Sequence, residues 1–213
     1  RDGMVLQHGT ILYDLDTRQV ERAVASIAAS LQTEVSKGRL TPEEKAGAMS
    51  QILPVSSLTD LKADLIIEAA VERLDVKKDL LGKIEEVNSG KAILATNTSS
   101  ISITRIGGVT KRPDRVMGMH FMNPPVLMQL IELIPGLLTS AETKVSVREL
   151  ALALGKTPVE SQDSPGFIAN RILMPMINEA IYSLYEGVAG VEEIDTVMKL
   201  GMAHPMGPLQ LAD

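Results

Sequence analysis

Cysteine and tryptophan are both absent from this 213-residue chain, and aromatic residues make up only 2% of it. Without cysteine the protein has no disulfide framework, no thiolate metal site and no cysteine nucleophile. Its three histidines lie far apart and form no histidine-rich motif, which argues against a metal site. Because aromatic residues are so few, the core must consist mainly of aliphatic side chains and methionines.

An excess of positive charge is also missing. The formal net charge is −6, which excludes a nucleic-acid-binding protein that relies on bulk charge. No apolar run approaches the roughly 20 residues that span a bilayer, and no signal peptide is visible. We therefore expect a cytoplasmic protein that binds neither nucleic acid nor membranes, with a length sufficient for one or two domains.

Short apolar segments alternate with amphipathic helical segments over the first three quarters of the chain. Strands are predicted at residues 10–14, 52–56, 65–70, 92–96, 116–120, 130–134 and 157–161. Between them, helices are predicted after Asp16 or Thr17, from the capping box Thr41–Glu44, and over 75–87 and 141–154. Such alternation is typical of a parallel, doubly wound α/β sheet. From Ser164 onward the pattern is helical, with helices predicted at 167–185, at 191–200 and after 204–208.

Asp14 stands between the first predicted strand and the first predicted helix. In a dinucleotide-binding fold an acid at this place binds the adenosine ribose hydroxyls and disfavours a 2′-phosphate. A carboxylate at a helix start would look the same in the sequence. No G-x-G-x-x-G motif is present to hold a pyrophosphate. We therefore expect that the first strand and the glycine-rich loop are missing, and that the chain is incomplete at both ends.

Two ionisable residues occur in neighbouring apolar strands, His120 at the end of one and Glu132 inside the next. The Asn-Pro-Pro turn at 123–125 lets the chain double back and bring them together. A carboxylate on one ring nitrogen fixes the tautomer and leaves the other nitrogen to act as a general base. A structural histidine and a solvated glutamate are the alternative interpretation. Polar residues 97–100 also follow a strand, where they can bind a ligand or cap a helix.

Seven segments of the sequence form an ordered set with family-like spacing. They are Leu12-Tyr13-Asp14, residues 68–72 (EAAVE), 95–100 (ATNTSS), 120–124 (HFMNP), 131–134 (IELI), 163–171 (DSPGFIANR) and 204–208 (HPMGP). Together they resemble the L-3-hydroxyacyl-CoA dehydrogenase family over essentially the whole chain. The resemblance implies a reversible, NAD-dependent oxidation of an (S)-3-hydroxyacyl-CoA, such as 3-hydroxybutyryl-CoA, in fatty-acid or butanoate metabolism.

The resemblance also implies a role for individual residues. His120 is the general base that takes the 3-hydroxyl proton, and Glu132 orients it. Ser99 and Asn170 contact the substrate oxygens, which suits a hydroxyl and an amide. The NAD site is implied to consist of Asp14, Glu72, Lys77, Asn97, Ser99 and Asn123. Ser30 and Lys37 are implied to meet the CoA end of the substrate.

The fold implied is a Rossmann-type doubly wound domain at residues 1–162, followed by an incomplete all-α domain at 163–213. The helical domain is expected to bind substrate and to form a homodimer. Two alternatives keep the same fold. One is a dehydrogenase of a small hydroxy acid without CoA, of the gulonate type, and the other is a non-catalytic protein related to the lens crystallins of this family.

Overall fold

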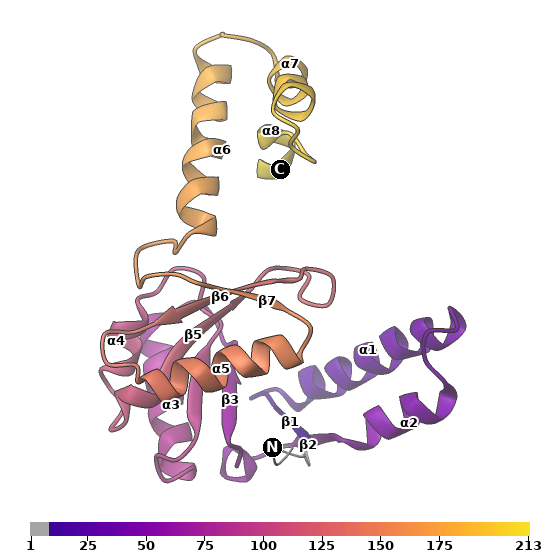
Figure 1. The fold of residues 1–213 in the computed structure, drawn as a ribbon, viewed down its shortest axis with the longest axis vertical. Helices are drawn as coiled ribbons and strands as arrows, with labels where there is room; N and C mark the ends of the chain where they lie inside the picture. The colour runs from indigo at the N-terminus through magenta and orange to yellow at the C-terminus, as the bar shows by residue number, and fades with distance from the viewer. Residues whose placement is uncertain (1–8) are drawn as a thin grey trace. The chain divides into compact units, whose positions relative to one another are not determined.

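The computed structural model describes residues 9–213, which are divided between two compact units. The first unit runs up to Ile66 and includes Leu80–Ala92, whereas the second consists of Ile67–Asp79 and Ile93–Asp213. Strand β3 (Leu65–Glu68) and helix α3 (Leu74–Val87) are each shared between the two units. The elements are labelled in Figure 1.

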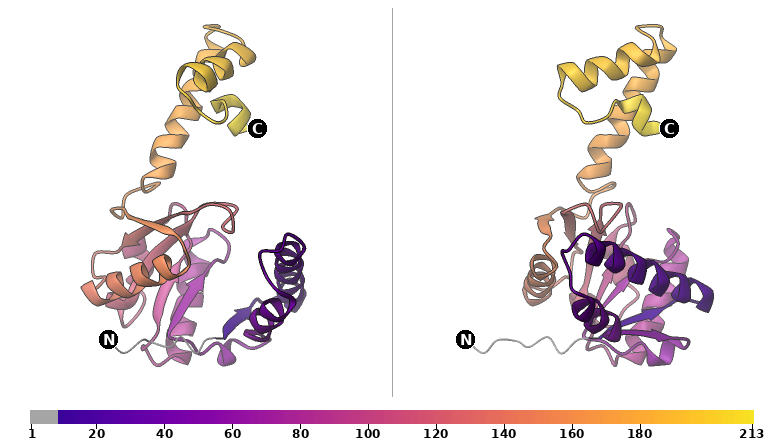
Figure 2. Two further views of the ribbon diagram at one scale, coloured as in Figure 1. Left: turned by 45° about the vertical axis from the view of Figure 1, so that its right-hand side comes forward. Right: turned by 90° about the vertical axis from the view of Figure 1, so that its right-hand side faces the viewer.

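The first unit contains β1 (Thr10–Tyr13), α1 (Thr17–Ser36), α2 (Pro42–Ser50), β2 (Ile52–Val55) and a 3-10 turn, Leu58–Asp60. Strands β1 and β2 pair in parallel as a two-stranded sheet of their own. Helices α1 and α2 lie side by side (Figure 2). The side chain of Asp16 caps α1, and Thr41 and Glu44 form the predicted capping box of α2. These two helix starts were therefore correctly predicted from the sequence.

The apolar side chains of α1 are only partly buried within the first unit. Val20 is the one residue of this helix that is buried, and Val24, Ile27 and Leu31 remain half-exposed. The burial of such side chains depends on the elements that pack against the helix, and not on helical periodicity alone.

The second unit is built on a five-stranded sheet with the order β3-β4-β5-β6-β7. Its other strands are β4 (Ile93–Thr96), β5 (Val116–Phe121), β6 (Leu130–Pro135) and β7 (Thr157–Glu160). Strand β5 is parallel to β4, and β7 is parallel to β6. Strand β6 runs antiparallel to β5, because the chain doubles back after Asn123 as predicted. The α/β fold class is confirmed, but the sheet is mixed rather than wholly parallel.

Helices α4 (Ile103–Gly107) and α5 (Ala141–Ala153) pack against β5 and β6. The core between these elements is aliphatic and rich in sulfur, as expected, with Met117, Met119 and Ile131 fully buried. Gly118 allows α4 to approach the sheet, since a Cβ atom at this position would lie 2.8 Å from Cδ1 of Ile103.

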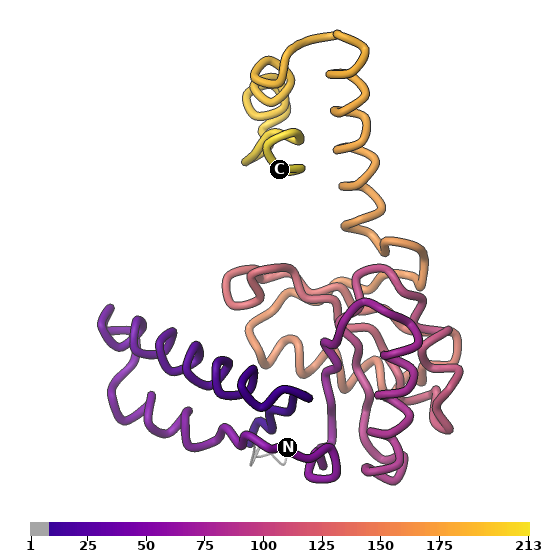
Figure 3. The backbone as a smooth tube through the Cα atoms, turned by 180° about the vertical axis from the view of Figure 1, so that it is seen from behind, coloured from indigo at the N-terminus to yellow at the C-terminus, as the bar shows by residue number. Residues whose placement is uncertain are grey.

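The chain ends in helices α6 (Ala169–Tyr185), α7 (Val191–Thr196) and α8 (Pro208–Ala212). The chain turns back after α6, so that α8 packs against it (Figure 3). Two details differ from the sequence prediction. Helix α6 begins after Phe167, whose φ of 51° is incompatible with a helix, and a π-helical turn at Val197–Gly201 follows α7. No helix of the part described here is long and apolar enough to span a membrane.

Candidate functional site

His120 and Glu132 form a buried pair at the centre of the second unit. They occupy directly opposite positions on β5 and β6, and Nδ1 of His120 lies 2.7 Å from Oε2 of Glu132. Their relative exposures are only 6% and 1%. A carboxylate at Nδ1 holds the proton there, so that the lone pair is on Nε2. Among residues 9–213, Nε2 has no hydrogen-bonding partner, which leaves it available as a base.

The second oxygen of Glu132 is held by the backbone at the start of α6. Its Oε1 accepts hydrogen bonds from the N–H groups of Ile168 (3.0 Å) and Ala169 (2.9 Å). A helix N-terminus has unpaired N–H groups and a positive dipole end, both of which favour a carboxylate. Glu132 is therefore fixed in position by two backbone hydrogen bonds.

The segment before α6 is shaped to bring these N–H groups to Glu132. Gly166 and Phe167 both have positive φ angles, 76° and 51°. A side chain at Gly166 would approach the backbone nitrogen of Arg171 to 2.9 Å, so only glycine fits there. The buried ring of Phe167 packs edge-on against the His120 ring at a centroid distance of 5.7 Å. This turn therefore orients both members of the pair.

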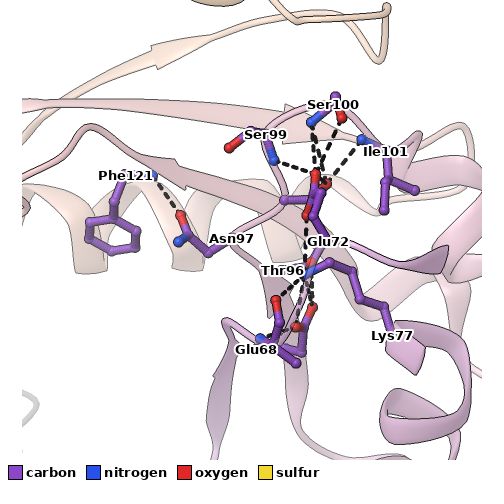
Figure 4. Close-up of polar contacts among 11 residues, drawn as sticks. Glu68, Glu72, Lys77, Thr96, Asn97, Ser99, Ser100, Ile101 and Phe121 are labelled. Atoms are coloured by element: carbon purple, nitrogen blue, oxygen red, sulfur yellow. Dashed lines mark hydrogen bonds and ion pairs between the residues drawn. The ribbon is translucent and has the colours of Figure 1, made fainter. Parts of the chain in front are cut away.

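A second polar cluster lies where β3 and β4 end (Figure 4). Glu72 Oε1 accepts hydrogen bonds from Thr98 Oγ1 (2.5 Å) and from the N–H groups of Ser99 (2.9 Å) and Ser100 (3.2 Å). Burial raises the pKa of the Glu72 carboxyl, but the hydrogen bonds from Thr98 and Ser99 and the charge of Lys77 outweigh it, so that the pKa is lowered. Glu72 is therefore a carboxylate that fixes the loop after β4.

Lys77 lies behind this carboxylate. Its side chain is 1% exposed, and its Nζ is 2.9 Å from Oε1 of Glu68 and 3.5 Å from Oε2 of Glu72. Thr96 Oγ1 also donates to Glu68, at 2.7 Å. Lys77 is therefore buried, and its contact with the exposed part of the site is its ion pair with Glu72.

Three more of the predicted residues meet at the same strand ends. Asn97 accepts a hydrogen bond from the N–H of Phe121 (2.9 Å), which ties the loop to the end of β5. The side-chain amide of Asn170 donates to the carbonyl oxygen of Ser99 (3.3 Å). The hydroxyl of Ser99 points away from Glu72 (Figure 4). The alternative interpretation of residues 97–100, a cap for the next helix, is wrong, because Ser102 caps α4.

The remaining predicted residues are exposed. Asn123 lies in the turn between β5 and β6. Asp14, Ser30 and Lys37 belong to the first unit, where Asp14 directly follows β1, Ser30 lies on α1 and Lys37 is at the end of α1. Lys37 forms an ion pair with Glu34 at 3.6 Å. No group of side chains with the composition of a metal site occurs in residues 9–213.

Sequence reasoning did not identify Glu68, Thr98 or Asp163 as site residues. The Asp163 carboxylate accepts hydrogen bonds from Ser102 Oγ and from the N–H groups of Ile103 and Thr104, at 2.8–2.9 Å. It thereby joins the segment after β7 to the start of α4. A charged residue within an apolar strand requires a buried partner, and this rule would have drawn attention to Glu68.

Known proteins with similar sequences identify the family of this chain. Residues 5–164 match the family described as "3-hydroxyacyl-CoA dehydrogenase, NAD binding domain", and residues 166–213 match its C-terminal domain. The chain belongs to the 3-hydroxyacyl-CoA dehydrogenase family. The resemblance, the enzyme class and the NAD cofactor inferred from the sequence motifs are thereby confirmed.

Members of the 3-hydroxyacyl-CoA dehydrogenase family with curated names are closely similar to the chain. A 3-hydroxybutyryl-CoA dehydrogenase of Bradyrhizobium diazoefficiens is 49% identical over 95% of this chain and 70% of its own length. A probable 3-hydroxybutyryl-CoA dehydrogenase of Bacillus subtilis is 47% identical over 95% of this chain and 71% of its own length. The crystal structure of (S)-3-hydroxybutyryl-CoA dehydrogenase from Ralstonia eutropha matches with a TM-score of 0.93 and 48% identity, over 96% of this chain and 72% of that one.

Proposed function

We propose that the protein oxidises (S)-3-hydroxybutyryl-CoA, or a similar 3-hydroxyacyl-CoA, to the 3-oxoacyl-CoA with NAD. The observation that carries this proposal is the buried His120–Glu132 pair, in which Glu132 is fixed by two backbone N–H groups. The names of the relatives, which are 3-hydroxybutyryl-CoA dehydrogenases, support the choice of substrate.

In this proposal His120 is the general base. Its Nε2 accepts the proton of the substrate 3-hydroxyl, and NAD, when bound, supplies the acceptor for the hydride from C3. Glu132 holds the proton on Nδ1 and stabilises the imidazolium that forms. Because the same imidazolium can return its proton to a 3-oxo group, the pair serves both directions of the reaction.

Ser99 and Asn170 are proposed to bind the oxygen atoms near the reacting carbon. Asn170 is joined to the Ser99 carbonyl, so the two residues lie next to each other. A hydroxyl and an amide can donate hydrogen bonds to an oxygen whose negative charge increases in the transition state. Asn170 follows the N–H groups that hold Glu132, which connects oxygen binding to the position of the base.

The proposed cofactor residues fit NAD in their chemistry. Asp14 presents an exposed carboxylate after a parallel strand, as a pair of ribose hydroxyls requires. Glu72, Asn97 and Ser99 lie at the ends of β3 and β4, and Lys77 contributes through Glu72. Asn123 adds an exposed amide after β5.

For the CoA end of the substrate we propose Ser30 and Lys37. Both side chains are exposed, and a lysine and a hydroxyl are suitable partners for the phosphates of CoA. The ion pair of Lys37 with Glu34 is long and exposed, so it contributes little and can be exchanged for a phosphate.

We also propose a domain boundary after residue 162 and a homodimer formed through α6–α8. Many apolar side chains in this helical segment are exposed, including Ile172 (66%) and Tyr185 (85%) on α6 and Leu200 (82%) in the turn after α7. Apolar surface of this kind commonly marks a contact between subunits. Analytical ultracentrifugation tests this, since a monomer at micromolar concentration would contradict it.

The decisive experiment measures NADH formation from (S)-3-hydroxybutyryl-CoA, on this chain and on a version extended at both ends to the length of its relatives. Turnover that disappears when free (S)-3-hydroxybutyrate or L-gulonate replaces the CoA ester would support the proposal. Turnover of the free acids would favour the hydroxy-acid alternative. Absence of turnover in both versions with every substrate would favour a non-catalytic protein.

Lys37→Ala is the matched variant, for which only the KM of the CoA substrate should rise.

A further inference from the structure

A buried ion pair lies behind the loop that carries Ser99. The side chains of Lys77 and Glu68 are 1% and 0% exposed, and Nζ of Lys77 lies 2.9 and 3.1 Å from the two carboxylate oxygens of Glu68. Taking two charges out of water is unfavourable, and apolar residues of similar volume are often equally stabilising. Stability alone therefore does not explain why this pair is present.

Three acceptor groups surround the ammonium group of Lys77. They are the Glu68 carboxylate, the carbonyl oxygen of Ala70 at 3.2 Å and Oε2 of Glu72 at 3.5 Å. All three acceptors lie within residues 68–72, from the last residue of β3 onward. Lys77 is therefore a fixed cation rather than a mobile one, and its ammonium group also forms an ion pair with Glu72.

Glu68 is itself held in place, so Lys77 cannot move aside with it. Its Oε2 accepts a hydrogen bond from Thr96 Oγ1 (2.7 Å), and its Oε1 accepts one from the N–H of Ala70 (2.5 Å). A continuous chain of contacts thus runs from Thr96 on β4 through Glu68 and Lys77 to Glu72 (Figure 4).

The far end of this chain of contacts is the loop after β4. With Oε2 facing Lys77, Glu72 presents Oε1 to Thr98 Oγ1 and to the N–H groups of Ser99 and Ser100. A carboxylate without the cation could rotate, since its side chain is 41% exposed. The position of the Ser99 loop then depends on the buried pair of Lys77 and Glu68, through Glu72.

We propose that Glu68 and Lys77 are positioning residues, whose buried ion pair fixes Glu72 and thereby the loop Thr98–Ser100 that presents Ser99 to the ligands. The last step rests on the proposed function, because it assumes that Ser99 binds cofactor and substrate. The effect on the loop itself does not depend on it.

The test is amide hydrogen exchange by NMR on this chain, comparing the wild type with the double variant Glu68→Gln/Lys77→Met. Removing both charges avoids leaving one of them buried and unpaired. We expect exchange at Ser99 and Ser100 to become faster by about tenfold or more, because each of these N–H groups would lose its hydrogen bond to a fixed carboxylate. Exchange at Ile168 and Ala169, which are held by Glu132, should not change.

The exposed pair Lys144–Glu160 (3.0 Å) provides a matched control, and Lys144→Met/Glu160→Gln should leave all four amides unchanged. Unchanged exchange at Ser99 and Ser100 in the Glu68/Lys77 double variant would overturn the proposal, as would an equal increase at all four amides. If the double variant does not fold, Glu68→Asp keeps both charges and only shortens the carboxylate arm. Faster exchange at Ser99 and Ser100 alone is expected for it too, and no change would refute the proposal.

A kinetic measurement then separates this proposal from the proposed function. With (S)-3-hydroxybutyryl-CoA and NAD, the double variant should raise KM for NAD about tenfold or more, with a smaller change in kcat. A normal KM together with faster exchange would refute the link to Ser99. A wild-type protein without any turnover would refute the proposed function, while the exchange experiment would still decide the role of the pair.

Discussion

The N–H of Ala169, the first residue of α6, donates a hydrogen bond of 2.9 Å to Oε1 of Glu132, whose other oxygen holds His120. Glu132→Gln replaces one carboxylate oxygen by an NH₂ group. The side chain can then no longer accept hydrogen bonds both from His120 and from the N–H groups of α6. We expect kcat to fall about 100-fold or more, within the range of general-base catalysis. Steady-state kinetics checks this, with Glu160→Gln as an exposed control that should retain full activity. Normal kcat in Glu132→Gln would show that Glu132 is structural.

His120→Gln should remove turnover while leaving cofactor binding nearly intact. The variant loses the base at Nε2, which accounts for a factor of about 100 to 10,000 in rate. NADH affinity can be followed by the fluorescence of the reduced nicotinamide. Equal losses in turnover and in NADH affinity would contradict the general-base role.

Asp14 should determine the choice of cofactor. Its exposed carboxylate would lie against the 2′-phosphate of NADP, and like charges in contact disfavour binding by several kcal/mol. We expect kcat/KM for NAD to exceed that for NADP by at least about 100-fold. Asp14→Ser should reduce this ratio, whereas Asp64→Ser, at another exposed position, should not. Comparable efficiency with both cofactors in the wild type would refute the assignment.

Asp163 should make the stability of the second unit depend on pH. Burial raises the pKa of this carboxyl, but hydrogen bonds from Thr104, Ser102 and Ile103 outweigh burial and lower the pKa in the folded protein. A group with a lowered folded pKa stabilises the fold above its unfolded pKa of about 3.9, and this stabilisation is lost as the pH falls through the folded value. Asp163→Asn should therefore lower Tm at pH 7.

The measurement for Asp163 is a series of thermal denaturation curves between pH 7 and pH 3. The difference in Tm between the wild type and Asp163→Asn should be constant above about pH 5 and should shrink below about pH 4. At neutral pH the variant should be less stable by about 1–2 kcal/mol, as for the loss of a helix cap. A difference that does not depend on pH would contradict the role of the charge, and Asp64→Asn serves as the exposed control.

The parts of the fold with local signals could be predicted from the sequence. The capping box of Thr41 and Glu44 and the doubling back after Asn123 depend on neighbouring residues, and both are found in the structure. The pairing of His120 with Glu132 also follows from the turn between their strands. The π-helical turn after Thr196 has no comparable signal, because α- and π-helical turns share nearly the same apolar pattern.

The contacts that complete the site could not be predicted in the same way. The N–H groups of Ile168 and Ala169 bind Glu132 across 36 and 37 residues, and backbone groups leave no trace in a sequence pattern. The role of Asp163 at α4 spans about 60 residues and depends on tertiary packing. Glu68 lies in an otherwise apolar strand, which indicates that a partner exists but not that it is Lys77.

The attachment of Glu132 to the start of α6 restricts which insertions and deletions the chain can tolerate. The segment from Ser161 to Ile168 must reach from β7 to the Glu132 carboxylate with the turn at Gly166 intact, so a single added residue there would displace a hydrogen-bond donor from the base. The bend after α6 at Gly187 has open space around it and bears no such restriction. Changes in length among homologous chains should therefore accumulate after α6 and be rare before it.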